Sequence, residues 1–325
     1  MSTVKNYLSL VKFSHTIFAM PFALIGFFLG AHTIIALNWA TSAVPGWHMT
    51  TERNLSGQST DRDFLRLISH YPVTGTQIIV RFILVIACMV FARSAAMGFN
   101  RWLDVKFDAL NPRTAIREIP AGIISKNSAL RFVIFSCLAF ITCTWFINPL
   151  CFALSFVALA VVLGYSYTKR FTPLCHLVLG IGLSLAPIGA YLAVTGEFAF
   201  LPVLFSFTVI FWVSGFDIIY ALQDEEFDRR NQLYSMPSWL GKAKALRVSE
   251  LLHLLSTVCV VTAGLYGIFG WWYWAGVAVF IGMLIYQHRL VKPNDLSRVN
   301  LAFMTANGIA SVVFAAFVIT DLFLR

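Results

Sequence analysis

Long apolar runs alternate with short polar segments along most of the chain. Nine of these runs are long enough to cross a bilayer as helices, because about 20 apolar residues span the hydrocarbon core. Very short turns, such as Asn148-Pro149 and Gly270-Trp271, join adjacent runs and make antiparallel neighbours. The pattern predicts an all-α integral membrane bundle of nine transmembrane helices, at residues 16–38, 76–98, 131–148, 150–167, 174–194, 201–217, 251–269, 271–288 and 301–322.

Residues 39–75 interrupt this pattern with a long polar segment that contains Pro45, Gly46, Gly57 and Pro72. We interpret it as a solvated loop with one short helix near 62–69 and assign it no catalytic role. No composition shift divides the chain further, so residues 1–325 are predicted to form a single domain that carries this loop.

The composition supports a lipid environment. Hydrophobic residues make up 58% of the 325 residues and charged residues only 12%, whereas soluble domains carry about 25% charged residues. A water-soluble core cannot hide so much apolar surface, so the bilayer is the expected partner. The formal net charge of +9 is then read as the excess of Lys and Arg in cytoplasmic loops and not as a sign of nucleic-acid binding.

The positions of Lys and Arg predict the orientation. With the N-terminus in the cytoplasm, the alternate loops on the same side collect most of the basic residues, from Lys5 to Arg298. The opposite side receives only Arg53, Arg62, Arg66 and Arg325. This asymmetry predicts a multi-pass protein of the inner (cytoplasmic) membrane, with the C-terminus outside.

A ladder of oxygen-bearing side chains follows the second run. Asn100, Asp104 and Asp108 recur every four residues, and on a helix this spacing stacks them on one face with a drift of about 40° per step. Carboxylates at the mouth of a membrane helix are costly unless they hold something. The ladder therefore predicts a site for a divalent metal and a phosphate.

A second ladder follows the sixth run. Asp217, Asp224 and Asp228 are seven and four residues apart and also share a helical face, with Tyr220 on the same stripe. The two ladders lie about 120 residues apart at the same side of the membrane and form a weak internal repeat. A lone Asp-x3-Asp is usually a solvated helix start, but two at matching depth favour a shared site.

Two facing ladders suit Mg²⁺, which prefers oxygen ligands and commonly combines one or two carboxylates with substrate phosphates. They predict two ions with a diphosphate between them, and basic side chains that balance the remaining charge. The alternative is that these basic residues only set the topology. His176 is predicted to be packed or interfacial and not catalytic. The candidate cations are Arg93, Arg113, Arg117, Lys169 and Arg170.

These motifs carry a family resemblance. NRWLDVKFDALNPRTAIREIPAG at 100–122 resembles the Asn-x3-Asp-x3-Asp motif of UbiA-type intramembrane prenyltransferases. DIIYALQDEEFD at 217–228 is similar to their second aspartate motif, in the form seen in 4-hydroxybenzoate polyprenyltransferases. YSYTKRFT at 165–172 resembles the Lys-Arg loop of the family, and KFSHTIFAMPFAL at 12–24 resembles the start of its first span. The sequence departs from many members at 117–120 and in the longer 39–75 loop.

The resemblance implies nine helices around a central cavity, with the polyprenyl tail leaving sideways towards lipid. It implies that Mg²⁺ and the diphosphate are held by Asn100, Asp104, Asp108, Asp224 and Asp228. Arg113, Arg117, Lys169 and Arg170 would stabilise the departing diphosphate. The aromatic faces that would shield the allylic cation belong to Phe99, Tyr165, Tyr167 and Tyr220.

The expected function is Mg-dependent transfer of a polyprenyl group from polyprenyl diphosphate to an aromatic acid in quinone biosynthesis. Asp217 is expected to accept a phenolic proton of the acceptor, and Arg93 to pair with its carboxylate. A naphthoate acceptor of menaquinone biosynthesis, or haem or a glycerol phosphate, remains an alternative. The alternative of a different class is a transporter or lipid carrier, which usually places its ionisable residues near the bilayer midplane.

Overall fold

The computed structural model describes residues 3–11, 18–43 and 74–324. These residues form helices joined by short connections, with no β-strand among them. The long helices are α2 (Met20–Ala43), α5 (Gly75–Leu103), α7 (Lys126–Ile147), α8 (Pro149–Thr168), α9 (Cys175–Thr195), α10 (Phe200–Ala221), α13 (Lys242–Tyr266), α14 (Trp271–Leu290) and α16 (Asn307–Leu324). The shorter elements are α1 (Thr3–Leu10), α6 (Val105–Leu110), η2 (Leu222–Asp224), α11 (Glu225–Arg230), α12 (Met236–Leu240), α15 (Val299–Leu301) and η3 (Ala302–Ala306).

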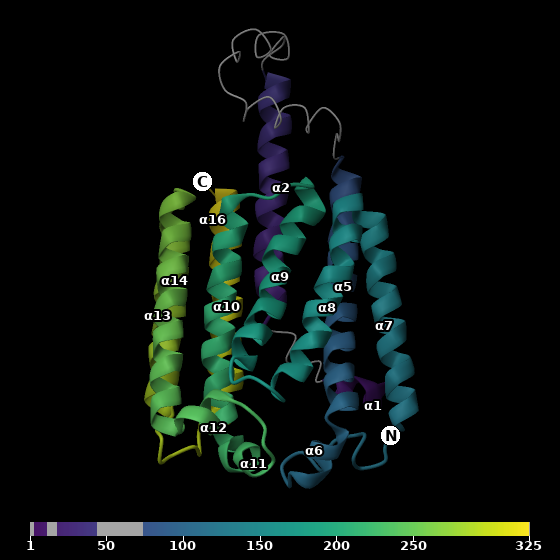
Figure 1. The fold of residues 1–325 in the computed structure, drawn as a ribbon. Coiled ribbons are helices and arrows are strands. Elements are labelled where there is room, and N and C mark those ends of the chain that lie inside the picture. Colours follow the sequence, from purple (N-terminus) through teal and green to yellow (C-terminus); the bar gives the residue numbers. More distant parts are fainter. Residues whose placement is uncertain (1–2, 12–17, 44–73, 325) are drawn as a thin grey trace.

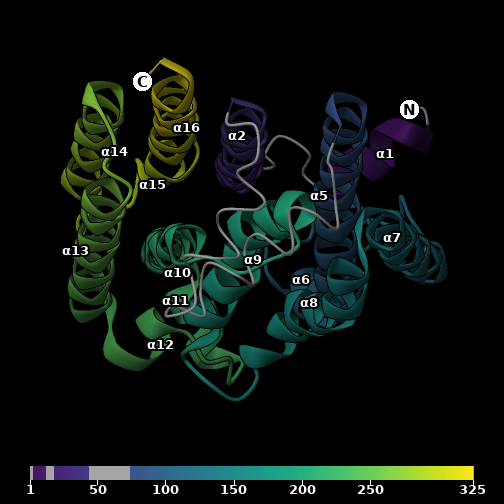
Figure 2. The ribbon, with the colours of Figure 1, turned by 90° about the horizontal axis from the view of Figure 1, so that it is seen from above.

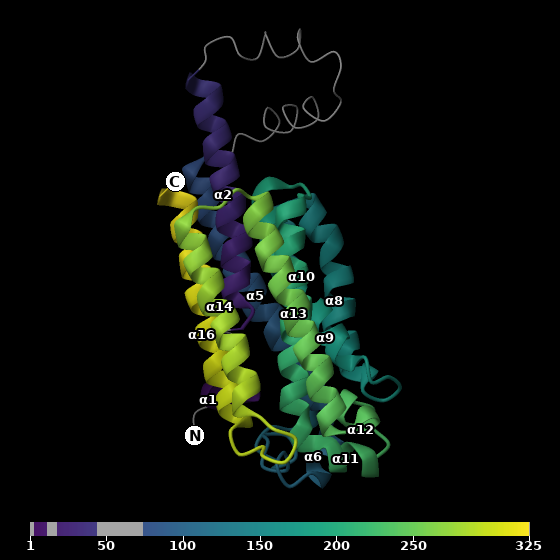
Figure 3. The same ribbon diagram turned by 90° about the vertical axis from the view of Figure 1, so that its left-hand side faces the viewer.

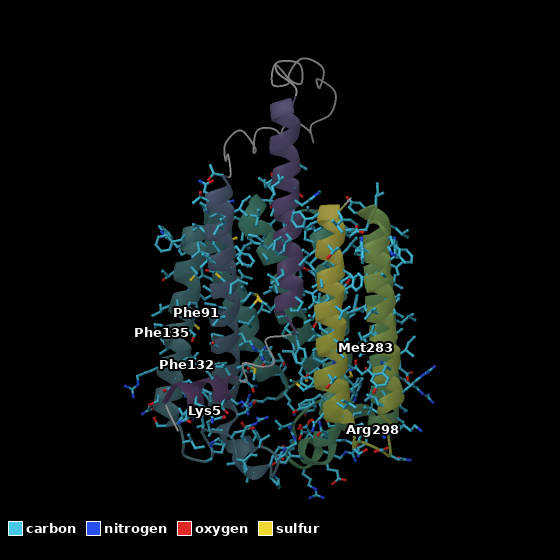
Figure 4. The ribbon with its side chains drawn as sticks, turned by 180° about the vertical axis from the view of Figure 1, so that it is seen from behind. Lys5, Phe91, Phe132, Phe135, Met283 and Arg298 are labelled. Carbon is cyan, nitrogen blue, oxygen red and sulfur yellow. The ribbon has the colours of Figure 1, made fainter. Side chains whose placement is uncertain are left out.

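The long helices run side by side as a bundle (Figure 1). Four short helices, α1, α6, α11 and α12, lie at one end, which we name the α6/α11 end (Figures 1 and 3). Seen from above, α13, α14 and α16 lie on one side and α5, α7 and α8 on the other, with α9 and α10 between them (Figure 2). Lys5 and Arg298 lie at the α6/α11 end (Figure 4), whereas α16 ends at the opposite end.

Seven helical segments of the described residues are long and apolar enough to cross a membrane. Two predicted runs, 16–38 and 271–288, fall outside this set, although α2 from Met20 onward and α14 are helical. The apolar part of α2, Met20–Ala36, is shorter than the others, and α14 contains three Trp residues and ends in polar side chains at 287–289. The all-helical membrane architecture is thus confirmed, and the count of nine spans stays a prediction.

Helix boundaries differ from the hydrophobic boundaries where polar residues continue a helix. α5 extends to Leu103, α10 to Ala221, and α13 begins already at Lys242, because helical hydrogen bonding does not stop where hydrophobicity does. α2 extends to Ala43 and so takes in the start of the predicted 39–75 loop. The greater part of that loop, 44–73, lies outside the described residues.

Close backbone contacts fix α9 between its neighbours. A Cβ added at Gly26 of α2 would lie 1.9 Å from the carbonyl oxygen of Pro187, and one at Gly180 would lie 2.5 Å from that of Ile210 in α10. Only glycine permits both approaches. Between α5 and α7 the contact is looser and aromatic, with the ring centroids of Phe91 and Phe135 6.2 Å apart (Figure 4).

A buried carboxylate near the C-terminus caps α14 from another helix. Asp321 of α16 accepts hydrogen bonds from the N–H groups of Gly270 (2.8 Å) and Tyr273 (3.3 Å). The first N–H groups of a helix have no partner within it, and a carboxylate there also interacts favourably with the helix dipole. Asp321 therefore joins the ends of α14 and α16.

We expect Asp321→Ala to lower the free energy of unfolding by about 2 kcal/mol, since it leaves two buried donors without an acceptor. Unfolding of the purified protein in detergent, followed by tryptophan fluorescence, measures this loss. Asp295→Ala, at an exposed loop carboxylate, is the matched control and should change little. An equal effect of the two substitutions would contradict the capping role.

Candidate active site

Both aspartate motifs lie at a break between a long helix and a six-residue helix. α5 ends at Leu103, Asp104 caps it with φ −91° and ψ 9°, and α6 follows. α10 ends at Ala221, the 3₁₀ turn η2 ends at Asp224, and α11 follows. The expectation that each ladder occupies one continuous helical face is therefore wrong in this detail. The weak repeat is visible, since α6 and α11 both carry Phe-Asp, at 107–108 and 227–228.

The residues of the first ladder remain near one another despite the break at Asp104. The N–H of Asp104 donates to the carbonyl of Asn100 (2.9 Å), and that of Asp108 donates to the carbonyl of Asp104 (2.8 Å). The four-residue hydrogen-bond step thus continues through the break. As a result the Asn100 amide Nδ2 donates to Asp104 Oδ2 at 3.1 Å.

Two basic residues after α8 link the motifs at the α6/α11 end. Arg170 Nη2 lies 2.7 Å from Asp104 Oδ1 of the first motif. Lys169 Nζ lies 2.7 Å from Asp228 Oδ1 of the second. Because Lys169 and Arg170 are adjacent in sequence, this loop holds the two motifs side by side.

The segment after α6 makes a second link. Arg113 Nη2 lies 2.5 Å from Asp224 Oδ2, and the Asn111 amide donates to Asp224 Oδ1 at 3.1 Å. Arg117 Nη1 lies 2.6 Å from Asp108 Oδ1. Each of the four aspartates is therefore paired with a different basic side chain, and four of the five predicted cations are brought together with them.

Burial and ion pairing set the charge state of this cluster. Burial has the largest effect on the pKa of Asp104 and raises it, although Arg170 acts in the opposite direction. Burial alone would lower the pKa of Lys169, but the neighbouring Asp228 outweighs it and the pKa is raised. In such a cluster the carboxylates and the basic side chains neutralise each other. A further cation or anion that binds there would compete for these partners and change the ion pairs.

A cavity of about 550 Å³ begins beside this cluster and extends between α5, α8 and α9. Most of its polar lining lies towards the α6/α11 end, with Thr144 and Ser155 further along, and the remaining lining is mostly apolar, including Ala92, Ala158, Ala186 and Gly189. The four paired aspartates are not among the described residues that line it. The polar lining there comprises Arg93, Asn100, Arg101, Arg117, Tyr165, Asp217 and Tyr220.

His176 holds Asp217 at the cavity wall. The N–H of Met236 donates to His176 Nε2 (3.3 Å), so Nδ1 carries the proton and donates to Asp217 Oδ2 at 2.6 Å. His176 is buried, as predicted. Its bond to Asp217 was not anticipated, because the two residues lie 41 positions apart without any local spacing signal.

The predicted aromatic residues separate into two groups. Tyr165 and Tyr220 line the cavity, and the Tyr220 hydroxyl accepts a hydrogen bond from Arg113 Nη1 at 3.1 Å. Phe99 instead contacts Trp102 and Tyr167, with ring centroids 5.7 and 6.0 Å away. Phe99 and Tyr167 are not among the described residues that line the cavity, so their expected shielding role is not supported.

This arrangement of paired aspartates and basic side chains beside an apolar cavity agrees with the comparison to known families. The model of the UbiA prenyltransferase family matches residues 70–309. The chain belongs to the UbiA prenyltransferase family. The resemblance inferred from the two aspartate motifs is thereby confirmed, and the protein is a membrane prenyltransferase.

Curated relatives support the same family. The chain is 31% identical over 230 residues to a 4-hydroxybenzoate octaprenyltransferase of Nitrosospira multiformis, covering 71% of this chain and 79% of the relative. A protein of the same name from Aeromonas salmonicida is 30% identical over 233 residues, with 71% and 79% covered.

Solved structures of UbiA homologues share the fold. The apo homologue from Aeropyrum pernix superimposes with a TM-score of 0.73 at 28% identity, over 94% of this chain and 98% of that protein. A homologue from Archaeoglobus fulgidus, bound to DMAPP and Mg²⁺, gives a TM-score of 0.66 at 16% identity, over 98% and 100% of the two chains.

Proposed function

We propose that this prenyltransferase transfers a polyprenyl group from a polyprenyl diphosphate to an aromatic acid, with Mg²⁺ as cofactor. The observation that carries the proposal is the cluster of four aspartates and four basic side chains at the mouth of an apolar cavity. Such a cluster suits a diphosphate and its metal, and the cavity suits a hydrocarbon chain. Relatives named 4-hydroxybenzoate octaprenyltransferase support an aromatic acid as the acceptor.

The residues present fit Mg²⁺. Their donors are oxygens, which Mg²⁺ prefers, and Asp108 Oδ2 is buried with no hydrogen-bond partner within the described ranges. No group of three acidic, histidine or cysteine side chains in those ranges is arranged to hold a metal alone, and substrate phosphates and water would supply the remaining oxygen ligands of Mg²⁺. Bound Mg²⁺ would neutralise charge on the leaving diphosphate. The residues proposed to hold it are Asn100, Asp104, Asp108, Asp224 and Asp228.

The four basic side chains bind and orient the diphosphate. Arg113, Arg117, Lys169 and Arg170 donate to its oxygens and favour departure of the diphosphate, because they stabilise the negative charge that grows on it. The prenyl chain extends into the cavity, where apolar side chains exclude water from the allylic cation. Tyr165 and Tyr220 line this end of the cavity, and their rings would stabilise the cation electrostatically.

Asp217 and Arg93 bind the acceptor. Asp217 lines the cavity and uses Oδ2 for His176, so Oδ1 is assigned to the phenolic hydroxyl, whose proton it accepts as the ring carbon attacks. Arg93 also lines the cavity and pairs with the acceptor carboxylate. A phenolic naphthoate presents the same two groups, so a naphthoate of menaquinone biosynthesis is the second candidate acceptor.

The same proposal includes a topology of nine spans around a central cavity, in the inner membrane. α1 and the terminus of α16 lie at opposite ends of the bundle (Figure 1), as an odd number of crossings requires. Lys169, Arg170 and the basic residues after α6 lie at the α6/α11 end, which supports a cytoplasmic location for that end. A transporter is disfavoured, since the paired charges lie at the end of the bundle and not at mid-depth.

Transfer can be measured with purified protein, Mg²⁺, a radiolabelled polyprenyl diphosphate and a panel of acceptors. We expect product with 4-hydroxybenzoate or a hydroxynaphthoate and none in excess chelator. Undiminished transfer in chelator would contradict the metal site. Absence of transfer to every phenolic acid would contradict the proposed function.

His176 is predicted to act through Asp217. We expect His176→Gln to lower kcat by about 10- to 100-fold with little change in the KM for the donor, because Asp217 loses the bond that orients it. Kinetics of the single variants and of His176→Gln/Asp217→Asn measure the coupling. The double variant should be no slower than Asp217→Asn, and additive losses would show that His176 acts elsewhere.

A further inference from the structure

Arg101 is a buried cation that the proposed mechanism leaves without a role. It lies in the last turn of α5, its side chain is part of the cavity lining, and the residue is only 3% exposed. Sequence reasoning treated it as one of the charges that set the topology. Burial of an arginine in a membrane helix is costly, and such residues usually face a cavity and a partner.

Arg101 forms no close ion pair with any described residue, although Asp108 and Glu118 are near enough to attract it. Its Nε and Nη1 atoms are buried and make no hydrogen bond with any described residue. By contrast, Arg113, Arg117 and Arg170 each contact an aspartate within 2.7 Å. Arg101 therefore presents unused donors at the cavity, which is an arrangement that suits an anionic ligand.

The position of Arg101 along α5 decides which anion it meets. Met89, Arg93, Met97 and Arg101 follow one another at four-residue intervals along the cavity stripe. Arg101 is about 4.5 Å along the axis from Asp104 but about 12 Å from Arg93. It thus lies at the inner edge of the diphosphate site, well away from the arginine assigned to the acceptor carboxylate.

The charges around Arg101 favour an incoming oxyanion. Arg117 lines the same end of the cavity and is already paired with Asp108. The single carboxylate of this lining, Asp217, is bonded to His176. Asp108 and Glu118 also act electrostatically on Arg101, but neither is among the described residues that line the cavity. In that lining, three guanidinium groups and one carboxylate leave a net positive charge.

We propose that Arg101 binds the phosphate of the donor that is attached to prenyl C1, on the cavity side of the diphosphate. When the bond between prenyl C1 and the phosphate ester oxygen breaks, the electron pair of the bond remains on that oxygen. Arg101 donates a hydrogen bond to the same oxygen. The aspartate cluster neutralises the outer side of the same diphosphate. This inference rests on the proposed function and adds a residue that touches the bond being broken.

The test compares Arg101→Met, Arg101→Lys and the wild type as full-length purified proteins. Methionine has a long, unbranched side chain but no charge. Lysine retains the positive charge but lacks the planar guanidinium group with its several N–H donors. Arg131→Met, at an exposed arginine of α7, is the control. The readouts are kinetics with the donor and the acceptor, inhibition by inorganic pyrophosphate with Mg²⁺, and the midpoint of thermal unfolding.

We expect Arg101→Met to lower kcat/KM for the donor by about 100-fold or more and Arg101→Lys by about 10-fold. Inhibition by pyrophosphate should weaken in parallel, while the KM for the acceptor stays unchanged. The unfolding midpoint of Arg101→Met should equal or exceed that of the wild type, because an unpaired buried charge has been removed. Arg131→Met should match the wild type throughout.

Three results would overturn the inference. A lower unfolding midpoint with unchanged kinetics would assign Arg101 to stability. A change confined to the KM for the acceptor would assign it to the acceptor carboxylate, and unaltered kinetics with unaltered pyrophosphate inhibition would assign it to neither substrate. Failure of the proposed function is distinguishable, because the wild type itself would then transfer no prenyl group.

Discussion

Asp104→Ala and Asp224→Ala are each expected to lower prenyl transfer by at least about 1,000-fold, because each removes a proposed metal ligand and leaves its basic partner unpaired. Asp104 pairs with Arg170, and Asp224 pairs with Arg113. Loss of either carboxylate would therefore alter both the proposed metal site and the orientation of an arginine proposed to bind the diphosphate. Transfer of a labelled prenyl group, with Mg²⁺ varied over a wide range, measures the effect.

The control for this prediction is Glu226→Ala. Glu226 is exposed on α11, two residues from Asp224, and its contact with Arg230 is a 3.7 Å pair at the surface. This variant should retain the activity of the wild type. All three variants should elute as folded protein in detergent, and substantial activity in either aspartate variant would refute the shared metal site.

Gly189→Phe is expected to abolish transfer from long polyprenyl donors while a short donor, such as dimethylallyl diphosphate, is still used. Gly189 lines the apolar part of the cavity, and a Cβ added there meets no atom within 4 Å. A phenyl ring at this position therefore extends into the cavity without displacing a neighbour. It occupies space that the distal units of a long prenyl chain require.

Product analysis with donors of increasing chain length tests this expectation, with Gly164→Phe as the control. Gly164 of α8 also has open space at its Cβ but is exposed and is not among the described residues lining the cavity. Gly164→Phe should accept every donor that the wild type accepts. If Gly189→Phe keeps the full range of chain lengths, the prenyl chain does not pass this part of the cavity.

Much of the fold follows from local patterns. The run at 150–167 corresponds to α8 (Pro149–Thr168) and the run at 174–194 to α9 (Cys175–Thr195). These predictions succeed because about 20 apolar residues in lipid have to satisfy their backbone groups as a helix. Helix boundaries that fall among polar residues were predicted less accurately, as at the start of α13 (Lys242–Tyr266). Hydropathy marks the apolar part of a helix and not the residue at which the helix begins.

The candidate site was predictable to the extent that its residues are close in sequence. The spacing of Asn100, Asp104 and Asp108, and of Asp224 and Asp228, identified both motifs, and the structure brings them to one end of the bundle. The breaks at Asp104 and at Leu222–Asp224 were not predictable. Each break depends on how a short helix packs across the bundle end, which a local spacing does not encode.

The sequence alone determined the helical membrane class, the two aspartate motifs and the basic residues that accompany them, because each depends on residues within a few turns of one helix. Only the tertiary structure decided which cation pairs with which aspartate, that His176 holds Asp217, and that two nitrogens of Arg101 are buried at the cavity without a hydrogen bond to any described residue. Most of those contacts join residues that are far apart in the sequence. Their partners are selected by packing between helices, for which a single sequence carries no periodic signal.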